Sequence, residues 1–563
     1  MSASSKKKLR KEQNAAAMTE KQQKELKEAK TLKAYTLTFA VVMILVVAIV
    51  LGVTLSGPVI GVINRNTHAV TVGEHKLTTT DLSYFYVDAI TDYYTNIYNQ
   101  YYPSYGNYWQ LALPFDISKP LDEQAKDDSN WGDYFVEQAI ESAKGIYGLY
   151  DKAVADNHTL TEDEQKALTS YLDGLDATAV TYGYSNASGY LRGSYGDGAN
   201  VKTYRNYYEV TALATSYYQK YVESLEYTND QLRDYEKDKF NTYSSFTYAT
   251  YQIKVSDYLG EGTKGADGKT TYTDEQKALA LEEAKKDAES LAGSPITTID
   301  QFNGYIKGLE INKENTKAAA TQNDNVFYNS ISNTDIQSWV SDSARQMNDT
   351  TVIAITQTKT TTTDKPDGDK SEEDKETEKE TTGYYVVYFV ERNDNLTNLT
   401  DVRHILIGFE GGKTDSTTGQ KTYTVEEKNM AKEKAQLLLD GWLAEENHNE
   451  DSFAALANLN SKDSDGKDGG LYEKVYPGQM VSAFNDWCFD ESRQPGDTGL
   501  VETEYGYHVM YFVKTHETTY RDYMIENDLI TEDSEKWMKA ITDAVSVTKV
   551  NLSGMETDYV MGY

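Results

Sequence analysis

The chain has 563 residues, with 55 Lys or Arg against 89 Asp or Glu, so its net charge is −34 at pH 7. That acidity argues against a nucleic-acid-binding surface, which needs clustered cations. The single cysteine excludes an intramolecular disulfide framework and any cysteine-rich zinc site. At about 150 residues per domain, the length predicts three or four domains.

The N-terminal segment divides into a basic and an apolar part. Residues 1–33 carry ten Lys or Arg and four Glu, and no charged residue occurs from Ala34 to Asn64. At 1.5 Å per residue, the apolar stretch Tyr35–Ser56 is about 33 Å long as a helix, enough to cross a bilayer. A buried core helix is the alternative, but a stretch this long without charge favours a transmembrane helix over residues 34–57.

The basic flank precedes this helix, so the positive-inside rule places residues 1–33 in the cytoplasm. We therefore expect a single-pass plasma-membrane protein with a cytoplasmic N-terminus and extracytoplasmic C-terminal domains. The sequence leaves open whether the anchor is cleaved.

Residues 65–245 are predicted to form a mostly helical domain. We expect helices over about 80–100, 131–156 and 161–174, the last opened by a capping box of Thr161 and Glu164, and two more within 203–240. Nine tyrosines lie between positions 84 and 108. They fit either of two roles: core residues of a polar protein, or an amphipathic surface for loosely folded polypeptides.

An internal repeat begins at Phe246. The segment Thr271–Lys277 recurs as Thr422–Lys428, and the strand-like segment Gly383–Val390 recurs as Gly506–Val513. The repeat predicts two tandem α/β modules, module one over residues 246–395 and module two over residues 396–517. An insertion in module one, residues 359–382, is nearly all Thr, Asp, Glu and Lys, and we expect it to be a disordered surface loop.

Module two carries two histidines on predicted strands, His404 and His508. The expected elements are a strand over 402–409, helices over 425–444 and 451–459, a Gly-rich turn over 465–470, a helix over 480–490, and strands over 499–502 and 506–514. A single buried histidine on a strand is more often a satisfied core residue than a catalytic one.

Several segments of module two resemble one enzyme family. Val402–Ile407 is similar to the first strand of parvulin-type peptidyl-prolyl isomerases, and Phe453–Ala457, Gly469-Gly470, Gly478–Val481 and Tyr505–Val509 follow in the family's order and spacing. The resemblance covers about 115 residues, or about a fifth of the chain. It implies a small antiparallel sheet flanked by helices and an enzyme that isomerises X–Pro bonds without a cofactor or metal.

The resemblance also implies the catalytic residues. His404 and His508 are expected on paired strands at the sheet centre, where their imidazoles can hydrogen-bond to each other. Asp463 occupies the position where family members carry Asp or Cys near the rotating amide. These three residues are the predicted catalytic set.

Four further residues are expected to bind or support the substrate. Met480 and Phe484, four apart on a predicted helix, lie on one face and can form an apolar wall for the proline ring. Thr503 and Tyr507 are expected to donate supporting hydrogen bonds. Taken by themselves, Met480 and Phe484 also have the usual pattern of core packing.

The order of the whole chain resembles the extracytoplasmic foldases of the PrsA and SurA type, although it lacks their lipid-attachment cysteine. In that arrangement the helical segments on either side of the isomerase form one chaperone domain, here residues 65–245 with a helix near 532–546 in the C-terminal segment 518–563. The implied partners are unfolded or nascent secreted polypeptides. The predicted fold class is α+β: one transmembrane helix, a helical chaperone-like domain and two parvulin-like modules.

Module one is expected to be inactive, because Tyr251 stands where module two has His404 and Tyr385 where it has His508. Two alternatives to an active foldase remain. One is a holdase chaperone without isomerase activity. The other is a structural surface-interaction protein that uses parvulin-like folds as spacers.

Two weaker patterns bear on ligands. The segment from Asp463 to Asp468 superficially resembles a calcium loop, but its acidic spacing does not fit an EF-hand, so we expect no metal site. No basic cluster follows the first strand of module two, so the expected substrate is unphosphorylated X–Pro. The oligomeric state stays open.

Overall fold

The computed structural model describes Gly57 and residues 59–265, 268–362, 375–416, 419–463, 468–555 and 557. The predicted transmembrane segment 34–57 therefore lies outside the described residues, except for Gly57. None of the helices in the described ranges has the length and apolarity needed to cross a bilayer. The chain divides into two units, unit 1 (residues 1–226 and 531–563) and unit 2 (residues 227–530), which are described separately.

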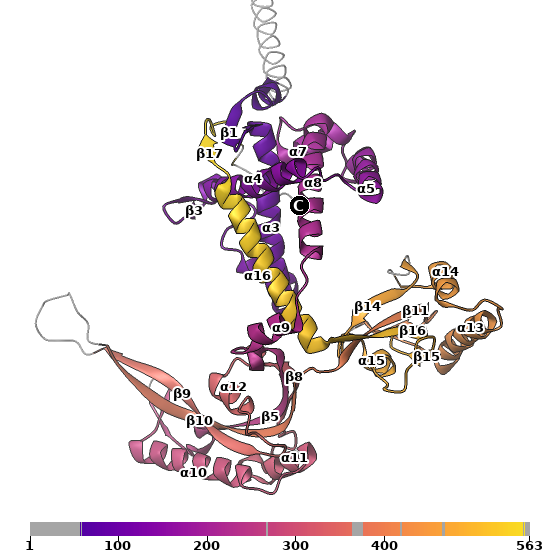
Figure 1. Cartoon of the computed structure of the whole chain (residues 1–563). Helices are drawn as coiled ribbons and strands as arrows, with labels where there is room; N and C mark the ends of the chain where they lie inside the picture. The colour runs from indigo at the N-terminus through magenta and orange to yellow at the C-terminus, as the bar shows by residue number, and fades with distance from the viewer. Residues whose placement is uncertain are drawn as a thin grey trace, which may run out of the picture. The chain divides into compact units, whose positions relative to one another are not determined.

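Unit 1 is built from helices closed by a small sheet (Figure 1). Its main elements are β1 (His68–Val72), β2 (His75–Thr78), α3 (Thr79–Tyr105), η1 (Gly106–Ala112), η2 (Leu121–Glu123), β3 (Ala125–Lys126), β4 (Ser129–Asn130), α4 (Trp131–Ala155), α5 (Glu162–Asp173), α6 (Leu175–Thr181), α7 (Ala187–Tyr195), α8 (Val201–Glu223) and β17 (Val547–Lys549). The expected helices at 80–100, 131–156 and 161–174 are confirmed, as is the Thr161–Glu164 capping box.

The two ends of the described chain meet in unit 1. β17 pairs antiparallel with β1, which pairs with β2. Phe85 and Ile90 of α3 pack with Phe135 and Ile140 of α4 in the main core. The C-terminal helix α16 (Tyr520–Ala544) starts well before the predicted residue 532, because Thr519 and Asp522 cap its first turn.

Unit 2 begins with α9 (Asn229–Glu236) and η3 (Phe240–Tyr243), which sequence reasoning had assigned to the helical domain ending at 245. Both pack with the start of α16, in a cluster around Leu232, Tyr243 and Ile525. The two modules follow.

The two modules have the same topology (Figure 1). Module one has the sheet order β8-β5-β10-β9 and module two the order β14-β11-β16-β15, and all neighbours are antiparallel. Module one consists of β5 (Ser245–Lys254), η4 (Val255–Tyr258), β6 (Thr263–Lys264), β7 (Thr270–Thr271), α10 (Asp274–Ala292), α11 (Ile299–Gly308), η5 (Glu310–Asn312), β8 (Thr321–Phe327), η6 (Tyr328–Ser330), α12 (Thr334–Val340), β9 (Thr350–Thr362) and β10 (Lys375–Asn393).

Module two repeats the strands and α-helices of module one in the same order. They are β11 (Asn398–Gly408), β12 (Lys413–Thr414), β13 (Lys421–Thr422), α13 (Val425–Leu443), α14 (Glu450–Asn460), β14 (Leu471–Val475), α15 (Ser482–Cys488), β15 (Thr498–Glu502) and β16 (Gly506–Thr519). The internal repeat predicted from the sequence is therefore confirmed as a repeat of topology.

Strand register corrects one predicted equivalence. Gly408 pairs with Gly506 in module two, and Lys254 pairs with Gly383 in module one. Counting back from these pairs, the position of His404 is taken in module one by Thr250, and not by Tyr251. A shift of one residue moves a side chain to the other face of a sheet. The equivalence of Tyr385 with His508 agrees with the register.

The insertion of module one differs from the expected loop. Residues 359–362 and 375–382 extend β9 and β10 as an antiparallel ribbon, with Thr362 paired to Lys375. Threonine favours extended strands, so a polar Thr-rich segment can continue a hairpin that the core has already started. Residues 363–374 lie outside the described part of the chain.

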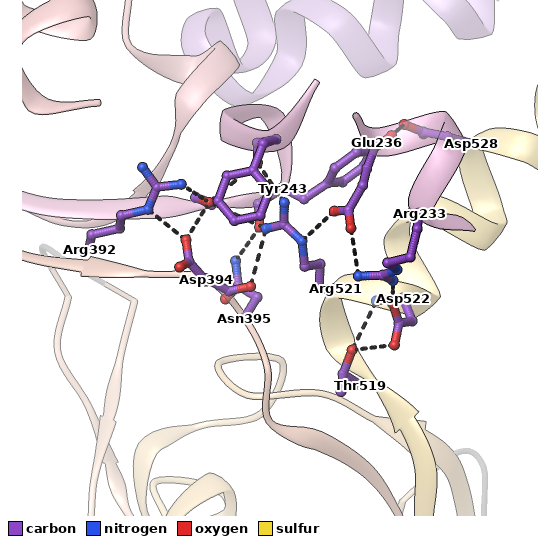
Figure 2. Close-up of polar contacts among 12 residues, drawn as sticks. Arg233, Glu236, Tyr243, Arg392, Asp394, Asn395, Thr519, Arg521, Asp522 and Asp528 are labelled. Carbon is purple, nitrogen blue, oxygen red and sulfur yellow. Dashed lines mark hydrogen bonds and ion pairs between the residues drawn. The ribbon is translucent and has the colours of Figure 1, made fainter. Parts of the chain in front are cut away.

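Both modules begin and end beside one buried polar cluster (Figure 2). Ser245 at the start of β5 pairs with Asn393 at the end of β10, and Asn398 at the start of β11 pairs with Thr519 at the end of β16. Arg521 lies between these ends with 1% of its surface exposed. This side chain thus contacts the segments that lead into and out of both modules.

The Arg521 guanidinium is fully occupied by partners from different segments. Its Nε donates to Glu236 Oε2 at 2.7 Å, and its other nitrogens donate to the carbonyl oxygens of Phe240, at 2.7 Å, and Asp394, at 3.3 Å. Glu236 also forms an ion pair with Arg233, with Glu236 Oε1 2.6 Å from Arg233 Nη1 (Figure 2). Buried charges of this kind are tolerated only when paired and hydrogen-bonded.

Candidate active site

Two central strands of module two bring the predicted histidines together. His404 on β11 pairs with Met510, and His508 on β16 pairs with Leu406, so both histidines lie on the same face as diagonal neighbours. Their Nδ1 atoms are 3.0 Å apart, and their exposed fractions are 2% and 5%. The predicted contact between the two imidazoles is present in the structure.

With both rings neutral, one order of protons satisfies the partners of this pair. His404 Nε2 lies 3.2 Å from Asp463 Oδ2, and His508 Nε2 lies 2.9 Å from Thr503 Oγ1. A carboxylate only accepts, so His404 donates from Nε2 and accepts at Nδ1 from His508. His508 Nε2 then accepts from the Thr503 hydroxyl. One chain of donors then runs from Thr503 through both imidazoles to Asp463.

Burial supports the neutral state of His508. The pKa of His508 is lowered to about 4, mainly by burial and also by the neighbouring His404, while Asp463 opposes the shift. The ring is therefore an uncharged hydrogen-bonding group at neutral pH.

We expect His508 to titrate near pH 4, against 6.5 for a free histidine. Because the folded pKa is below the unfolded one, the unfolded chain binds the proton first, so module two loses stability as the pH falls from 6.5 to 4. The loss reaches about 3 kcal/mol at pH 4. The ring signal of His508 in NMR, assigned with His508→Gln, measures the midpoint; a midpoint above 6 would contradict the neutral chain.

An apolar wall covers the histidine pair. The Phe484 ring meets His404 and His508 edge-on, with ring centroids 5.3 Å apart in both cases. Met480 packs on the same cluster as Phe484 and Cys488. The predicted placement of Met480 on a helix is wrong, because α15 begins at Ser482 and Val481 before it is extended. The two side chains still share the apolar wall.

Asp463 is held by Ser461 and by Tyr472, and the sequence analysis missed Tyr472. Its backbone N–H donates to Ser461 Oγ at 3.2 Å, and Tyr472 donates to its Oδ2 at 3.3 Å. The Tyr472 ring also packs on His404, with centroids 5.0 Å apart. Tyr472 is the second residue of β14, which begins directly after Gly469-Gly470. Its place beside this family motif was the sequence feature that could have identified it.

The other two predicted donors lie on opposite faces of the sheet. Thr503 is buried and forms a hydrogen bond with His508. It therefore positions the histidine and does not contact the substrate directly. Tyr507 belongs to the cluster with Ile405 and Val509, on the helix-covered face, and donates to Glu502. Adjacent strand residues point to opposite faces, so Tyr507 cannot share a pocket with His508.

The arrangement suits binding of a twisted amide better than covalent chemistry. Burial raises the pKa of the Cys488 thiol to about 12, so it is no nucleophile at neutral pH. Within the described ranges, no group of three His, Cys, Asp or Glu side chains is placed to hold a metal ion. Residues 464–467 of the calcium-like segment lie outside those ranges. What remains is a neutral polar floor beside an apolar wall.

Module one lacks this floor. The positions of His404 and His508 are taken by Thr250 and Tyr385, as the strand register shows. Tyr251, on the opposite face, bonds Asn312. The two modules therefore share a topology and differ at the site.

Comparison with known proteins identifies the same region. Residues 384–516 match the family model described as the PPIC-type PPIASE domain. The matched range starts within β10 of module one and takes in the histidine pair and Asp463. A comparison with curated proteins found no match.

Solved structures are similar at low identity. PrsA from Bacillus subtilis is 11% identical over 79% of this chain and 100% of its own, with a TM-score of 0.25. Peptidylprolyl isomerase (PrsA) from Bacillus cereus is 21% identical over 29% of this chain and 57% of its own, with a TM-score of 0.17. One of the SurA-like chaperones of Campylobacter jejuni is 20% identical over 26% of this chain and 51% of its own, with a TM-score of 0.17. These likenesses carry no conclusion about function.

Proposed function

Because residues 384–516 of this chain are a PPIC-type peptidyl-prolyl isomerase domain, we propose that the protein is a membrane-anchored extracytoplasmic foldase. Its parvulin domain isomerises X–Pro bonds of secreted polypeptides, and its helical unit 1 holds them while unfolded. The observation that carries the isomerase is the buried, neutral His404–His508 pair beside Phe484.

The chemistry needs no cofactor. An X–Pro bond isomerises in tens to hundreds of seconds, because rotation removes amide resonance at a barrier of about 18–20 kcal/mol. Acceleration by about 10⁵-fold requires about 7 kcal/mol of preferential binding to the twisted amide. The wall of Met480 and Phe484 holds the proline ring, and the polar floor of His404, His508 and Asp463 faces the rotating amide.

The test is prolyl isomerase turnover by the full-length protein on unphosphorylated Xaa-Pro peptides. Acceleration supports the foldase. Absence of acceleration by a folded protein that still prevents aggregation supports the holdase alternative. Absence of both activities supports a structural role.

The anchor is proposed from the sequence alone. The apolar segment Tyr35–Ser56 behind a basic flank supports an N-terminus in the cytoplasm, with the residues that follow position 57 outside. Protease accessibility of the C-terminal modules in intact cells tests this orientation.

An exposed aromatic surface supports the holding role of unit 1. The end of α3 and the following η1 carry side chains that remain open to solvent, and we call this set the tyrosine surface: Tyr98, Tyr102, Tyr105, Tyr108 and Leu111. Tyr98 and Tyr102 stack on each other at 4.7 Å. Tyr108 is 72% exposed and Leu111 84%. Such a surface offers apolar area with polar tips, which suits unfolded chains of varied sequence.

Replacing Tyr105 and Tyr108 with serine is expected to weaken capture of an aggregating client about tenfold, because two large apolar contacts are lost. Light scattering of a denatured client at rising protein concentration measures the effect. Tyr182→Ser is the matched control, since Tyr182 is 67% exposed elsewhere in unit 1. Equal loss in the control would show that the tyrosine surface has no special role.

A further inference from the structure

Module one has a basic groove beside its sheet. The groove has a volume of about 740 Å³ and lies among the end of β5, η4, α10 and the β9–β10 ribbon. Val255, Leu259 and Leu281 form its apolar part, and Lys254, Lys277 and Lys379 are its cations. Among the residues that line it, Glu380 is the counter-charge. A concentration of cations is unusual in a chain whose net charge is −34.

Module two carries a larger side chain at a matching position. Phe409, which follows β11, corresponds to Val255, which follows β5, and its ring packs on Tyr423 at 5.0 Å. Lys428 Nζ lies 5.4 Å from the centre of that ring. In module one the smaller Val255 stands at this position and lines the groove.

In module two, the lysine at this place is paired with a carboxylate of the same module. Lys428 forms an ion pair with Glu502 at 2.9 Å, and Glu502 pairs in register with Tyr507. In module one the equivalent of Lys428 is Lys277, and the residue paired with Tyr384 at the position of Glu502 is Ala354.

Lys277 has therefore lost the carboxylate that its repeat partner has. Its recorded ion pair is with Asp274 at 3.7 Å, and both side chains of that pair are half-exposed or more. A contact of this kind contributes little. The ribbon adds Lys379 at the same place.

We propose that this groove binds an acidic segment of an extended polypeptide, whose carboxylates take the place of the missing Glu502 equivalent. The identification of the ligand as a polypeptide rests on the proposed function. The apolar part of the groove accommodates neighbouring side chains, and the edge strand β9, which lines the groove through Gln357, can pair with an extended chain. Salt screens charges beyond about 8 Å, so the local lysines outweigh the distant negative charge of the protein.

The probe is a short fluorescent peptide of alternating Glu and Val, compared with its Gln-and-Val counterpart in anisotropy titrations of the full-length protein. The acidic peptide is expected to bind about tenfold more tightly at low salt, with the difference shrinking as salt rises. The double variant Lys277→Gln/Lys379→Gln is expected to abolish this preference. Lys285→Gln/Lys313→Gln is the matched control, since these lysines of module one are paired with Glu289 and Glu310.

Ala354→Glu gives a sharper test, because it restores the internal carboxylate. It is expected to lower affinity for the acidic peptide about tenfold, whereas Ala354→Gln, of the same size without charge, leaves it unchanged. Ala354 is exposed, so neither variant disturbs the core. Equal binding of the two peptides, or no difference between Ala354→Glu and Ala354→Gln, would overturn the proposal.

Two further readouts separate the outcomes. Inorganic polyphosphate that binds through the same lysines when the acidic peptide does not bind would overturn the proposal in favour of a phosphate polymer. Isomerase turnover is measured on the same protein. Turnover without acidic-peptide binding refutes the groove alone, and acidic-peptide binding without turnover refutes the isomerase alone.

Discussion

Replacing His508 with alanine is expected to lower kcat/KM for prolyl isomerisation about 100-fold, or about 2.7 kcal/mol of transition-state stabilisation. The substitution removes the middle of the donor chain, so the Thr503 hydroxyl and His404 Nδ1 each lose the His508 ring as a buried partner. The loss should fall mainly on kcat, because Met480 and Phe484 still hold the proline ring.

The measurement is the rate of cis-to-trans conversion of a proline peptide by the full-length protein, with kcat and KM determined separately. His448→Ala is the matched control, since His448 is an exposed histidine of the same module, bonded to the Glu445 carbonyl. Thr503→Val tests the direction of the chain and should lower kcat less than His508→Ala does. Unchanged kcat/KM in His508→Ala would remove the histidine pair from the mechanism.

Replacing Arg521 with methionine is expected to lower the free energy of unfolding of unit 2 by about 3–5 kcal/mol, because Glu236 remains buried with part of its charge uncompensated. The substitution also leaves the Phe240 and Asp394 carbonyl oxygens without their donor. Hydrogen exchange of the backbone amides of β5 and β11, measured at rising urea concentration, gives the loss of stability of each module separately.

The double variant Arg521→Met/Glu236→Leu separates the charge from the packing. It is expected to recover most of the lost stability, since an apolar pair can replace a buried ion pair at little cost. Lys536→Met is the control, because Lys536 forms an exposed pair with Glu532 and its loss should change stability little. A loss as small as the control's in Arg521→Met would show that the polar cluster does not hold the modules' ends.

Local patterns in the sequence were enough for the elements of module two. The residue pattern predicted β11, α13 and α14 closely, and it predicted the start of β16, which continues beyond the predicted end at 514 to Thr519. The repeat and the two histidines followed from self-comparison and from the family resemblance. His404, His508 and Asp463 lie together as that resemblance implied. These features depend on residues near each other in the chain or on motifs in fixed order.

Properties that depend on register and face could not be obtained this way. One residue of strand register decides that Thr250, and not Tyr251, stands in the place of His404. The pleat sends Tyr507 away from His508, and an extended Val481 keeps Met480 off its helix. A sequence pattern gives the period of a strand but not its pairing partner.

The sequence by itself determined the repeat, the two histidines and the charge-free segment near the N-terminus, because each is a pattern of composition or spacing. Only the tertiary structure decided that Tyr472 supports Asp463, that Arg521 gathers the ends of both modules, and that module one has a basic groove beside its sheet. Each of these depends on side chains from segments distant in sequence. Such contacts arise from packing and pairing in three dimensions, which no local pattern encodes.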